Sequence, residues 1–251
     1  MLSLNDQTIL ITGASRGIGA ATARIALEAG ATVVGTYNRS AGALEELARE
    51  CGSSRVHALQ SDLGLPGAGH ALWRRALQQA GKIDGLVNNA GIAPPTKLDG
   101  EYAEWQRDWA QVLAVNTQAV ADLCRDAVLY FKPRGGGRIV TVASRAAFRG
   151  DTIDYLHYAA SKGAIVSLMR SIARGFAAER ILAFIIAPGW VSTDMASVIH
   201  EPGNESALAE IPMGEAAPPE EVAHMIVFLL SGMVDHSTGA TFDINGASYV
   251  R

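Results

Sequence analysis

Residues 8–19 read TILITGASRGIG, an apolar run that passes directly into a glycine-rich turn. The run TILIT (8–12) has the length and β-branched content of a buried strand, and the residues after the turn follow a helical pattern. Glycine lets the backbone approach a pyrophosphate, which the first N–H groups of the helix then bind. Gly13, Gly17 and Gly19 form a G-x3-G-x-G variant of the dinucleotide fingerprint. The turn lacks the GK[ST] sequence of a nucleotide triphosphatase loop, which argues against that class. The stretch predicts a dinucleotide-binding strand-turn-helix unit.

Short apolar runs alternate with helix-length segments along almost the whole chain. This alternation is typical of βαβ crossovers and a parallel sheet, and apolar strands without polar alternation fit a sheet covered on both faces. We therefore expect a doubly wound α/β fold, with long helices over 101–131 and 156–178. The expected strands are TILIT (8–12), ATVVGTY (31–37), RVHAL (55–59), GLVN (85–88), RIVTVA (138–143), ILAFIIA (181–187) and ATFDI (240–244).

Length and pattern together predict one domain over residues 1–251. A chain of 251 residues that is 49% hydrophobic can bury one large core, and it shows no repeat or linker. The regular pattern fails over 190–219, where short helical pieces mix with Pro and Gly. A loop of that length in a compact domain is commonly a lid or binding loop. We expect 190–219 to be the substrate-binding loop.

Composition excludes several other classes of protein. The net charge is −4, and the sequence has neither a Lys/Arg block nor zinc-type Cys/His spacing, so we expect no nucleic acid partner and no metal. The first apolar run spans only about five residues, too short for a signal peptide or a membrane span. A cytoplasmic protein is expected. Cys51 and Cys124 fit core or surface thiols better than a disulfide or a nucleophile.

The end of the second expected strand, TYNRS (36–40), bears on the choice of cofactor. An NAD-specific site carries an acidic residue there for the ribose 2′-hydroxyl. This sequence has Arg39 instead, and Arg16 in the glycine loop can approach it. Because a guanidinium suits a 2′-phosphate, we expect a preference for NADP(H). The alternative is that Arg39 is only a solvated surface charge.

The stretch YAASK (158–162) places a phenol and an amine on one helix face, because residues four apart are neighbours there. Carbonyl reduction needs a hydride and a proton, and nicotinamide supplies only the hydride. A free phenol has a pKa near 10, and an ammonium about 4 Å away stabilises its anion by up to about 4 kcal/mol. We therefore expect Lys162 to lower the pKa of Tyr158. The alternative is a pair on a solvated surface.

Taken together, these motifs resemble the short-chain dehydrogenase/reductase family, in its single-domain branch, over essentially the whole chain. The resemblance implies an oxidoreductase with a Rossmann-type sheet of seven parallel strands in the order 3-2-1-4-5-6-7. The stretch AAER (177–180) departs from the family, which usually has a glycine before the next strand. The motifs that carry the resemblance are TGASRGIG, Asp62, NNAG (88–91), Asn116, Ser144, YAASK, PG (188–189) with Thr193, and TGATFDING (238–246).

The resemblance also implies the cofactor contacts. Asp62 and Leu63 would bind the adenine, and the Pro188 turn would bind the nicotinamide carboxamide. The expected cofactor residues are Gly13, Ser15, Arg16, Gly17, Ile18, Gly19, Asn38, Arg39, Asp62, Leu63, Asn89, Ala90, Gly91, Tyr158, Lys162, Pro188, Gly189, Val191 and Thr193.

The catalytic set implied by the resemblance has four members: Asn116, Ser144, Tyr158 and Lys162. Ser144 would donate to the substrate oxygen as negative charge develops on it. Lys162 would also hold the nicotinamide ribose, and Asn116 would hold a water that links the lysine to solvent.

The substrate is less well defined by the sequence. The expected pocket is apolar, shows no anchor for a phosphate or carboxylate, and fits core packing equally well; its residues are Ala146, Phe148, Trp190, Met195 and Ile199. The pattern is closest to the 3-oxoacyl-[acyl-carrier-protein] reductase type, in which arginines meet an acidic carrier protein. Here Arg174, with Lys132 or Arg134, would do so. One alternative is a reductase of free ketones, sugars or polyols. A second is a non-catalytic dinucleotide-sensing protein, but such proteins tend to lose the tyrosine or the lysine, and Tyr158 and Lys162 are both present.

The two long expected helices also predict an assembly. Family members pair through these helices into four-helix bundles and through the C-terminal segment into tetramers, so the resemblance implies a homotetramer. The apolar residues that could face the sheet or a partner are Trp105, Trp109, Val112, Leu123, Ile165, Leu168 and Met169.

Overall fold

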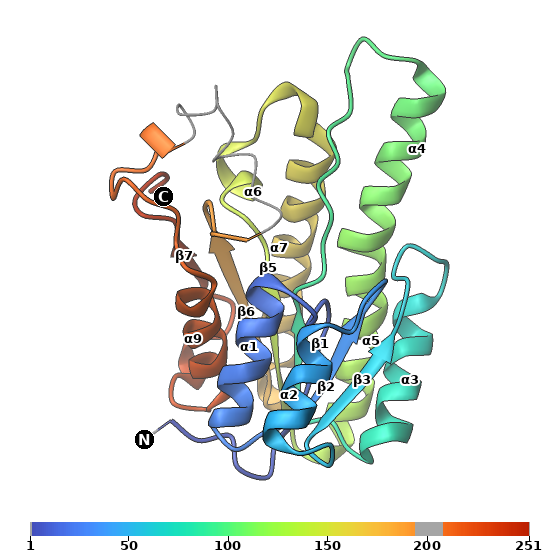
Figure 1. The fold of residues 1–251 in the computed structure, drawn as a ribbon, viewed down its shortest axis with the longest axis vertical. Coiled ribbons are helices and arrows are strands. Elements are labelled where there is room, and N and C mark those ends of the chain that lie inside the picture. The colour runs from blue at the N-terminus through green and yellow to red at the C-terminus, as the bar shows by residue number, and fades with distance from the viewer. Residues whose placement is uncertain (1, 194–207, 251) are drawn as a thin grey trace.

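The computed structural model describes residues 2–193 and 208–250, and the expected pocket residues Met195 and Ile199 lie outside these ranges. Seven parallel strands form one sheet in the order β3-β2-β1-β4-β5-β6-β7, which confirms the expected topology (Figure 1). The strands are β1 Thr8–Ile11, β2 Thr32–Tyr37, β3 Val56–Gln60, β4 Gly85–Asn88, β5 Gly137–Val142, β6 Ile181–Pro188 and β7 Thr241–Ile244.

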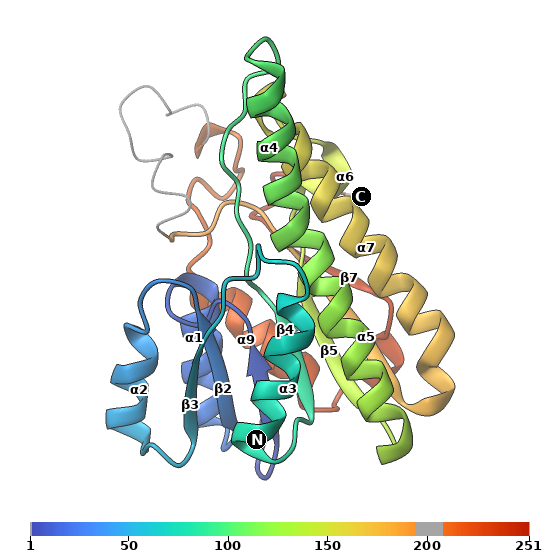
Figure 2. The same ribbon diagram turned by 90° about the vertical axis from the view of Figure 1, so that its right-hand side faces the viewer.

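Helices cover both faces of the sheet, as Figures 1 and 2 show from two directions. Helices α1, α2 and α9 pack on one face, and α3, α5 and α7 pack on the other. The helices are α1 Gly17–Glu28, α2 Ala43–Cys51, α3 Ala68–Ala80, α4 Tyr102–Leu113, α5 Ala119–Phe131, α6 Ala146–Arg149, α7 Leu156–Phe176 and α9 Pro219–Leu230. Short 3₁₀ turns cover Lys132–Arg134, Ile153–Tyr155, Ala177–Glu179 and Asp235–Ser237.

The two covered faces explain why the strands are apolar without alternation. In β1, Leu10 packs into the core under α3, α5 and α7, whereas Ile9 and Ile11 pack into the core under α1, α2 and α9. All eight residues of β6 are buried. Because side chains of a strand alternate between faces, a strand buried on both faces needs no alternation of polar residues. None of the helices among the described residues is long and apolar enough to cross a membrane.

The expectation of one continuous helix over 101–131 is wrong in its middle. Helix α4 ends at Leu113, a π-helical turn covers Ala114–Gln118, and α5 begins at Ala119. A π turn inserts one residue into an α-helix and often marks a functional site. Asn116 lies in this turn and turns its side chain to the backbone of Ile92 instead of solvent. The sequence pattern does not reveal the extra residue, since the helical period resumes after it.

The connection before β6 shows what replaces the missing glycine. Arg180 adopts a φ of +59°, a left-handed conformation that glycine adopts more readily. Its guanidinium forms an ion pair with Asp235 at 3.0 Å. The chain therefore keeps the turn with a non-glycine residue whose side chain has a partner.

Candidate active site

The glycine loop has a geometry that side chains would block. Gly13 and Gly17 have φ values of +65° and +52°, and the Gly13 N–H donates to Thr36 Oγ1 at 3.1 Å. A Cβ on Gly19 would stand 2.1 Å from the carbonyl oxygen of Gly13. The loop thus folds back on the start of α1 so closely that only glycine fits. The exposed backbone this leaves at a helix N-terminus fits a pyrophosphate.

The NNAG segment ties β4 to its two neighbouring strands. Asn89 Nδ2 donates to the carbonyl oxygens of Thr12 and Gly13 at 2.9 and 3.1 Å. Asn88 is buried, and its Nδ2 donates to Thr141 Oγ1 at 3.1 Å and to Cys124 Sγ at 3.3 Å. Burial raises the pKa of the Cys124 thiol to about 12, which agrees with a core thiol and not a nucleophile.

A cavity of about 430 Å³ lies where the adenosine half of the cofactor is expected. Asn38, after β2, and Asp62, after β3, both line it. Asp62 Oδ1 accepts a hydrogen bond from the Gly64 N–H at 2.9 Å, and Leu63 is buried in the core. Arg39, next to Asn38, is exposed to solvent.

The segment after β6 approaches the glycine loop. The Gly189 N–H donates to the carbonyl of Ile244 at 2.9 Å, and the Thr193 N–H donates to the carbonyl of Val191 at 2.7 Å. A Cβ on Gly17 would stand 3.0 Å from the Thr193 methyl carbon. Two segments far apart in the sequence, both expected to contact the cofactor, therefore meet in space.

Three of the four expected catalytic residues meet at the carboxyl end of β5. Ser144 follows β5, and its side chain is hydrogen-bonded to that of Tyr158 in the first turn of α7. Ser144 Oγ also accepts from the Ala146 N–H at 3.1 Å. Lys162 is buried, its Nζ donates to the carbonyl of Val142 at 2.9 Å, and it lies 5.7 Å from the centre of the Tyr158 ring.

Asn116 joins this group through the π turn. Its side chain accepts from the Ile92 N–H and donates to the Ile92 carbonyl, each at 2.9 Å. It also donates to Ser161 Oγ at 3.1 Å, and Ser161 donates to the carbonyl of Tyr158 at 2.7 Å. A Cβ on Gly91 would stand 3.3 Å from Lys162 Nζ and 3.4 Å from Asn116 Oδ1. Ser161 was missed in the sequence, although it stands inside the YAASK motif.

The ionisation of the pair differs from the sequence-based expectation. Burial raises the pKa of Tyr158 above its ordinary value, and the hydrogen bond with Ser144 offsets part of this. The pKa of Tyr158 therefore rises where we expected it to fall, because burial is the largest cause of the shift. The Lys162 ammonium donates to the Val142 carbonyl. Burial lowers the pKa of Lys162 to about 8. Tyr158 is thus a protonated phenol at neutral pH, ready to donate.

The expected substrate pocket is described only in part. Ala146 is buried, and Phe148 stacks on Tyr249 with ring centres 6.4 Å apart. Trp190 lies 5.8 Å from the guanidinium carbon of Arg145. The region around the expected pocket is therefore not purely apolar, because Arg145, the residue after Ser144, is buried there. The sequence did not indicate Arg145, because its partner Glu210 lies 65 residues away along the chain.

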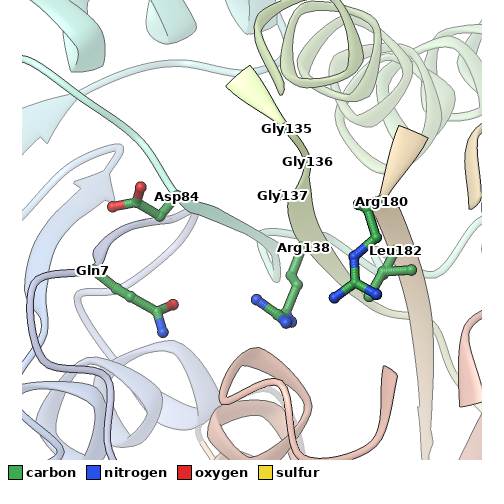
Figure 3. Close-up of a pocket in the computed structure, with 8 residues that line it drawn as sticks. All are labelled: Gln7, Asp84, Gly135, Gly136, Gly137, Arg138, Arg180 and Leu182. Carbon is green, nitrogen blue, oxygen red and sulfur yellow. The ribbon is translucent and has the colours of Figure 1, made fainter. Parts of the chain in front are cut away.

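A second cavity, of about 270 Å³, lies at the opposite end of the sheet (Figure 3). Figure 3 shows Arg138, at the start of β5, and Arg180, before β6, among the residues that line it. Both arginines form ion pairs with Asp235, at 2.9 and 3.0 Å. In parallel α/β sheets ligands bind at the carboxyl ends of the strands, so we assign this amino-end cavity no catalytic role.

The fold and the Ser144, Tyr158 and Lys162 group define a dinucleotide-dependent oxidoreductase of the Rossmann class. Residues 13–247 match the family model described as "Enoyl-(Acyl carrier protein) reductase". The chain belongs to this family, within the short-chain dehydrogenases/reductases, which confirms the resemblance seen in its motifs.

Particular relatives cover the whole chain. The 3-oxoacyl-[acyl-carrier-protein] reductase FabG of Vibrio cholerae is 30% identical over 249 residues, with 99% of this chain and 100% of that protein covered. The crystal structure of a 3-ketoacyl-(acyl-carrier-protein) reductase from Brucella melitensis with NADH has a TM-score of 0.86 at 30% identity, covering 99% and 100% of the two chains. A 3-oxoacyl (acyl-carrier-protein) reductase from Agrobacterium tumefaciens with NADP bound has a TM-score of 0.88 at 33% identity, covering 98% and 95%.

Proposed function

We propose that this chain transfers hydride between NADP(H) and a carbonyl or secondary alcohol. The observation that carries the proposal is the convergence of Ser144, Tyr158 and Lys162 at the carboxyl end of β5. Lys162 Nζ lies close to Gly91, and Asn89, two residues before Gly91, is hydrogen-bonded to the glycine loop. One site thus combines a proton donor, Tyr158, a cation, Lys162, and a loop suited to bind a dinucleotide.

The residues fit the cofactor, because the glycine loop leaves bare backbone at the start of α1 and a cavity lies beside Asn38 and Asp62. When bound, the nicotinamide supplies the hydride. Tyr158 donates its proton to the substrate oxygen, and Ser144 donates a hydrogen bond to that oxygen as charge develops. Lys162, held by the Val142 carbonyl, stabilises the phenolate that remains. Asn116 and Ser161 fix the backbone around Tyr158.

The preference for NADP(H) rests on the end of β2. Arg39 is exposed next to Asn38, which lines the adenosine-side cavity, and a guanidinium there can meet a 2′-phosphate. We expect kcat/KM with NADPH to exceed that with NADH by tenfold or more, and Arg39→Ala to remove most of the difference. Equal efficiency with both cofactors in the unchanged protein would refute the preference.

For the substrate we propose a 3-oxoacyl thioester, on the strength of the full-length similarity to 3-oxoacyl reductases. The alternative, a free ketone, sugar or polyol, is favoured by one observation, the buried Arg145 beside Ser144. A panel of short 3-oxoacyl thioesters, free ketones and polyols, followed by NADPH fluorescence, separates the two. No NADPH oxidation on any carbonyl would leave the non-catalytic, dinucleotide-sensing role.

Docking of a carrier protein would depend on which of the three expected basic side chains are available. Lys132 forms an ion pair with Glu179 at 3.1 Å, and Arg134 lies 3.8 Å over the Tyr130 ring. Arg174, exposed on α7, is then the available cation among the three. We expect Arg174→Glu to raise KM for a carrier-bound thioester but not for the same acyl group on a small thiol.

The proposal has three further parts. Residues 1–251 form one domain, residues 190–219 are its substrate loop, and the chain assembles into a homotetramer. Val112, Leu123, Ile165 and Met169 are buried within the chain. The helix surfaces left for a partner instead expose other apolar side chains, namely Leu113, Leu129 and Leu156. Sedimentation at micromolar concentration tests the assembly, and a monomer would contradict it.

A further inference from the structure

The two arginines after Ser144 form a cationic cluster that the hydride transfer does not use. Arg145 precedes α6 and Arg149 ends it, and the Nη2 atoms of both lie 3.3 Å from the same oxygen, Oε2 of Glu210. Asp151 adds a weaker attraction for Arg145 from the solvent side. Glu210 is half exposed, whereas the Arg145 side chain is only 5% exposed. A buried cation thus shares one exposed carboxylate with a second cation.

Arg145 also has hydrogen-bonding capacity that nothing in the described part of the chain uses. Its Nη1 is fully buried without a partner among residues 2–193 and 208–250, and so is Nε1 of the neighbouring Trp190. Arginine is almost never buried unless it is paired, and a buried N–H without an acceptor is costly. The guanidinium remains charged, because arginine does not lose its proton in proteins. Two donors without a partner, on side chains that are in contact, are consistent with an acceptor supplied by a ligand.

The position of these donors relates them to the reacting carbonyl. Arg145 follows Ser144 directly, and its N–H donates to the Pro188 carbonyl at 2.9 Å, at the end of β6. Trp190 stands two residues beyond Pro188. The donors therefore lie on the two segments that flank the carboxyl ends of β5 and β6. An acceptor bound to them would lie close to the segment that carries Ser144.

We propose that Arg145 and the Trp190 indole N–H bind a carboxylate on the substrate, so that the chain acts on free oxo acids and their hydroxy acids. This inference rests on the proposed hydride transfer. It favours the second substrate class, free ketones, over the 3-oxoacyl thioester and narrows that class to oxo acids. A guanidinium binds a carboxylate in a bidentate, charge-assisted way, which matches a charged group with a free Nη1. A neutral thioester offers no such group.

Glu210 holds the position beside the two arginines that a substrate carboxylate would take. Its contacts to both arginines are 3.3 Å long and use a single oxygen, whereas charge-assisted pairs are commonly about 2.7–2.9 Å. A substrate carboxylate that uses both of its oxygens competes well with it. The Glu210 carboxylate therefore competes with the substrate carboxylate for the two arginines, and removing its charge should strengthen substrate binding.

The test compares acids with their own methyl esters. The acids are 3-oxobutanoate, 4-oxopentanoate and 5-oxohexanoate, and NADPH is the reductant. Each acid is assayed beside its own methyl ester, which lacks the negative charge of the carboxylate. We expect kcat/KM for at least one acid to exceed that of its ester by roughly 10- to 100-fold, mostly through KM. Arg145→Met keeps the length of the side chain without the charge, and we expect the acid-to-ester ratio to fall to about one. Arg49→Met, on the exposed face of α2, is the matched control and keeps the ratio.

Glu210→Gln separates substrate binding from a purely structural role for Arg145. We expect this variant to raise the acid-to-ester ratio several-fold. Equal losses for acid and ester in Arg145→Met and Glu210→Gln would show that the cluster only holds the protein together, and would overturn the inference. Esters reduced without any preference for acids overturn it too, yet leave the proposed reductase intact.

Calorimetric titration of butanoate into the NADPH complex gives a readout without turnover. Binding that Arg145→Met abolishes supports the inference, whereas undetectable or Arg145-independent binding contradicts it. Failure of every ketone and thioester to oxidise NADPH, by contrast, overturns the proposed function itself.

Discussion

The two ends of the sheet each hold two arginines that share one carboxylate, and the clusters differ in how completely they are paired. At the amino end, Asp235 accepts from Arg138 at 2.9 and 3.2 Å and from Arg180 at 3.0 Å, and it is 17% exposed. At the carboxyl end, a half-exposed Glu210 accepts over longer contacts, and a buried donor of Arg145 stays unfilled. The complete cluster holds strands together, and the incomplete one has capacity left for a ligand.

The largest expected effect separates chemistry from stability at the carboxyl end. Tyr158→Phe removes the proton donor and is expected to lower kcat for a reducible ketone by roughly 10²- to 10⁴-fold. The free energy of unfolding changes by about 1 kcal/mol or less, because one hydrogen bond to Ser144 is lost. NADPH oxidation and urea unfolding measure the two quantities. Tyr155→Phe, three residues earlier, is the matched control, and near-normal turnover of Tyr158→Phe would eliminate the catalytic assignment.

The next effect should appear in stability alone, at the amino end. Asp235→Asn keeps the shape of the side chain but removes the charge that pairs two guanidiniums. We expect the free energy of unfolding to fall by about 2 kcal/mol, with kcat unchanged. Glu210→Gln should cost about half of that or less, because its contacts are longer and more exposed. Equal losses from the two variants would remove the distinction between the clusters.

Lys162 provides a test in which the sign depends on pH. Its folded pKa of about 8 lies below the ordinary 10.5, so below pH 8 the buried ammonium destabilises the folded chain in full. Between pH 8 and 10.5 the folded chain binds fewer protons than the unfolded chain, and stability rises with pH. Lys162→Met should therefore be more stable than the unchanged protein by about 1–2 kcal/mol at pH 7. The burial of Tyr158 is common to both proteins and does not enter the difference.

Urea unfolding at pH 7 and pH 10 checks this expectation. The advantage of Lys162→Met should shrink towards pH 10, where the lysine is neutral in the folded state. A difference that stays constant with pH would show that burial of the charge does not cause it.

The smallest effect concerns the strained turn of the amino-end cluster. Arg180→Gly relieves a left-handed conformation worth about 1 kcal/mol, but it loses a surface ion pair of up to about 1 kcal/mol. The two nearly cancel, and we expect a change within about 0.5 kcal/mol by urea unfolding. Arg180→Ala keeps the strain and loses the ion pair, so it should be the less stable variant. The reverse order would contradict this account of the turn.

Much of the fold followed from local patterns. The apolar runs predicted all seven strands to within a residue or two, since a strand buried on both faces needs a continuous apolar stretch. The break at Asn116 did not follow, because a π turn leaves the helical pattern on either side unchanged. The motifs located Asn116, Ser144, Tyr158 and Lys162, the four residues that we propose as catalytic, but the ionisation of Tyr158 did not follow from them.

The sequence by itself determined the reaction class, because the glycine loop, NNAG and YAASK need particular residues at short, fixed spacings that remain visible in the chain. Only the tertiary structure decided the direction of the Tyr158 pKa shift and the pairing of Arg145 with Glu210, 65 residues away. Burial and long-range contacts arise when distant segments pack together. The spacing of residues along the chain does not record which donors will find an acceptor and which will be left for a ligand.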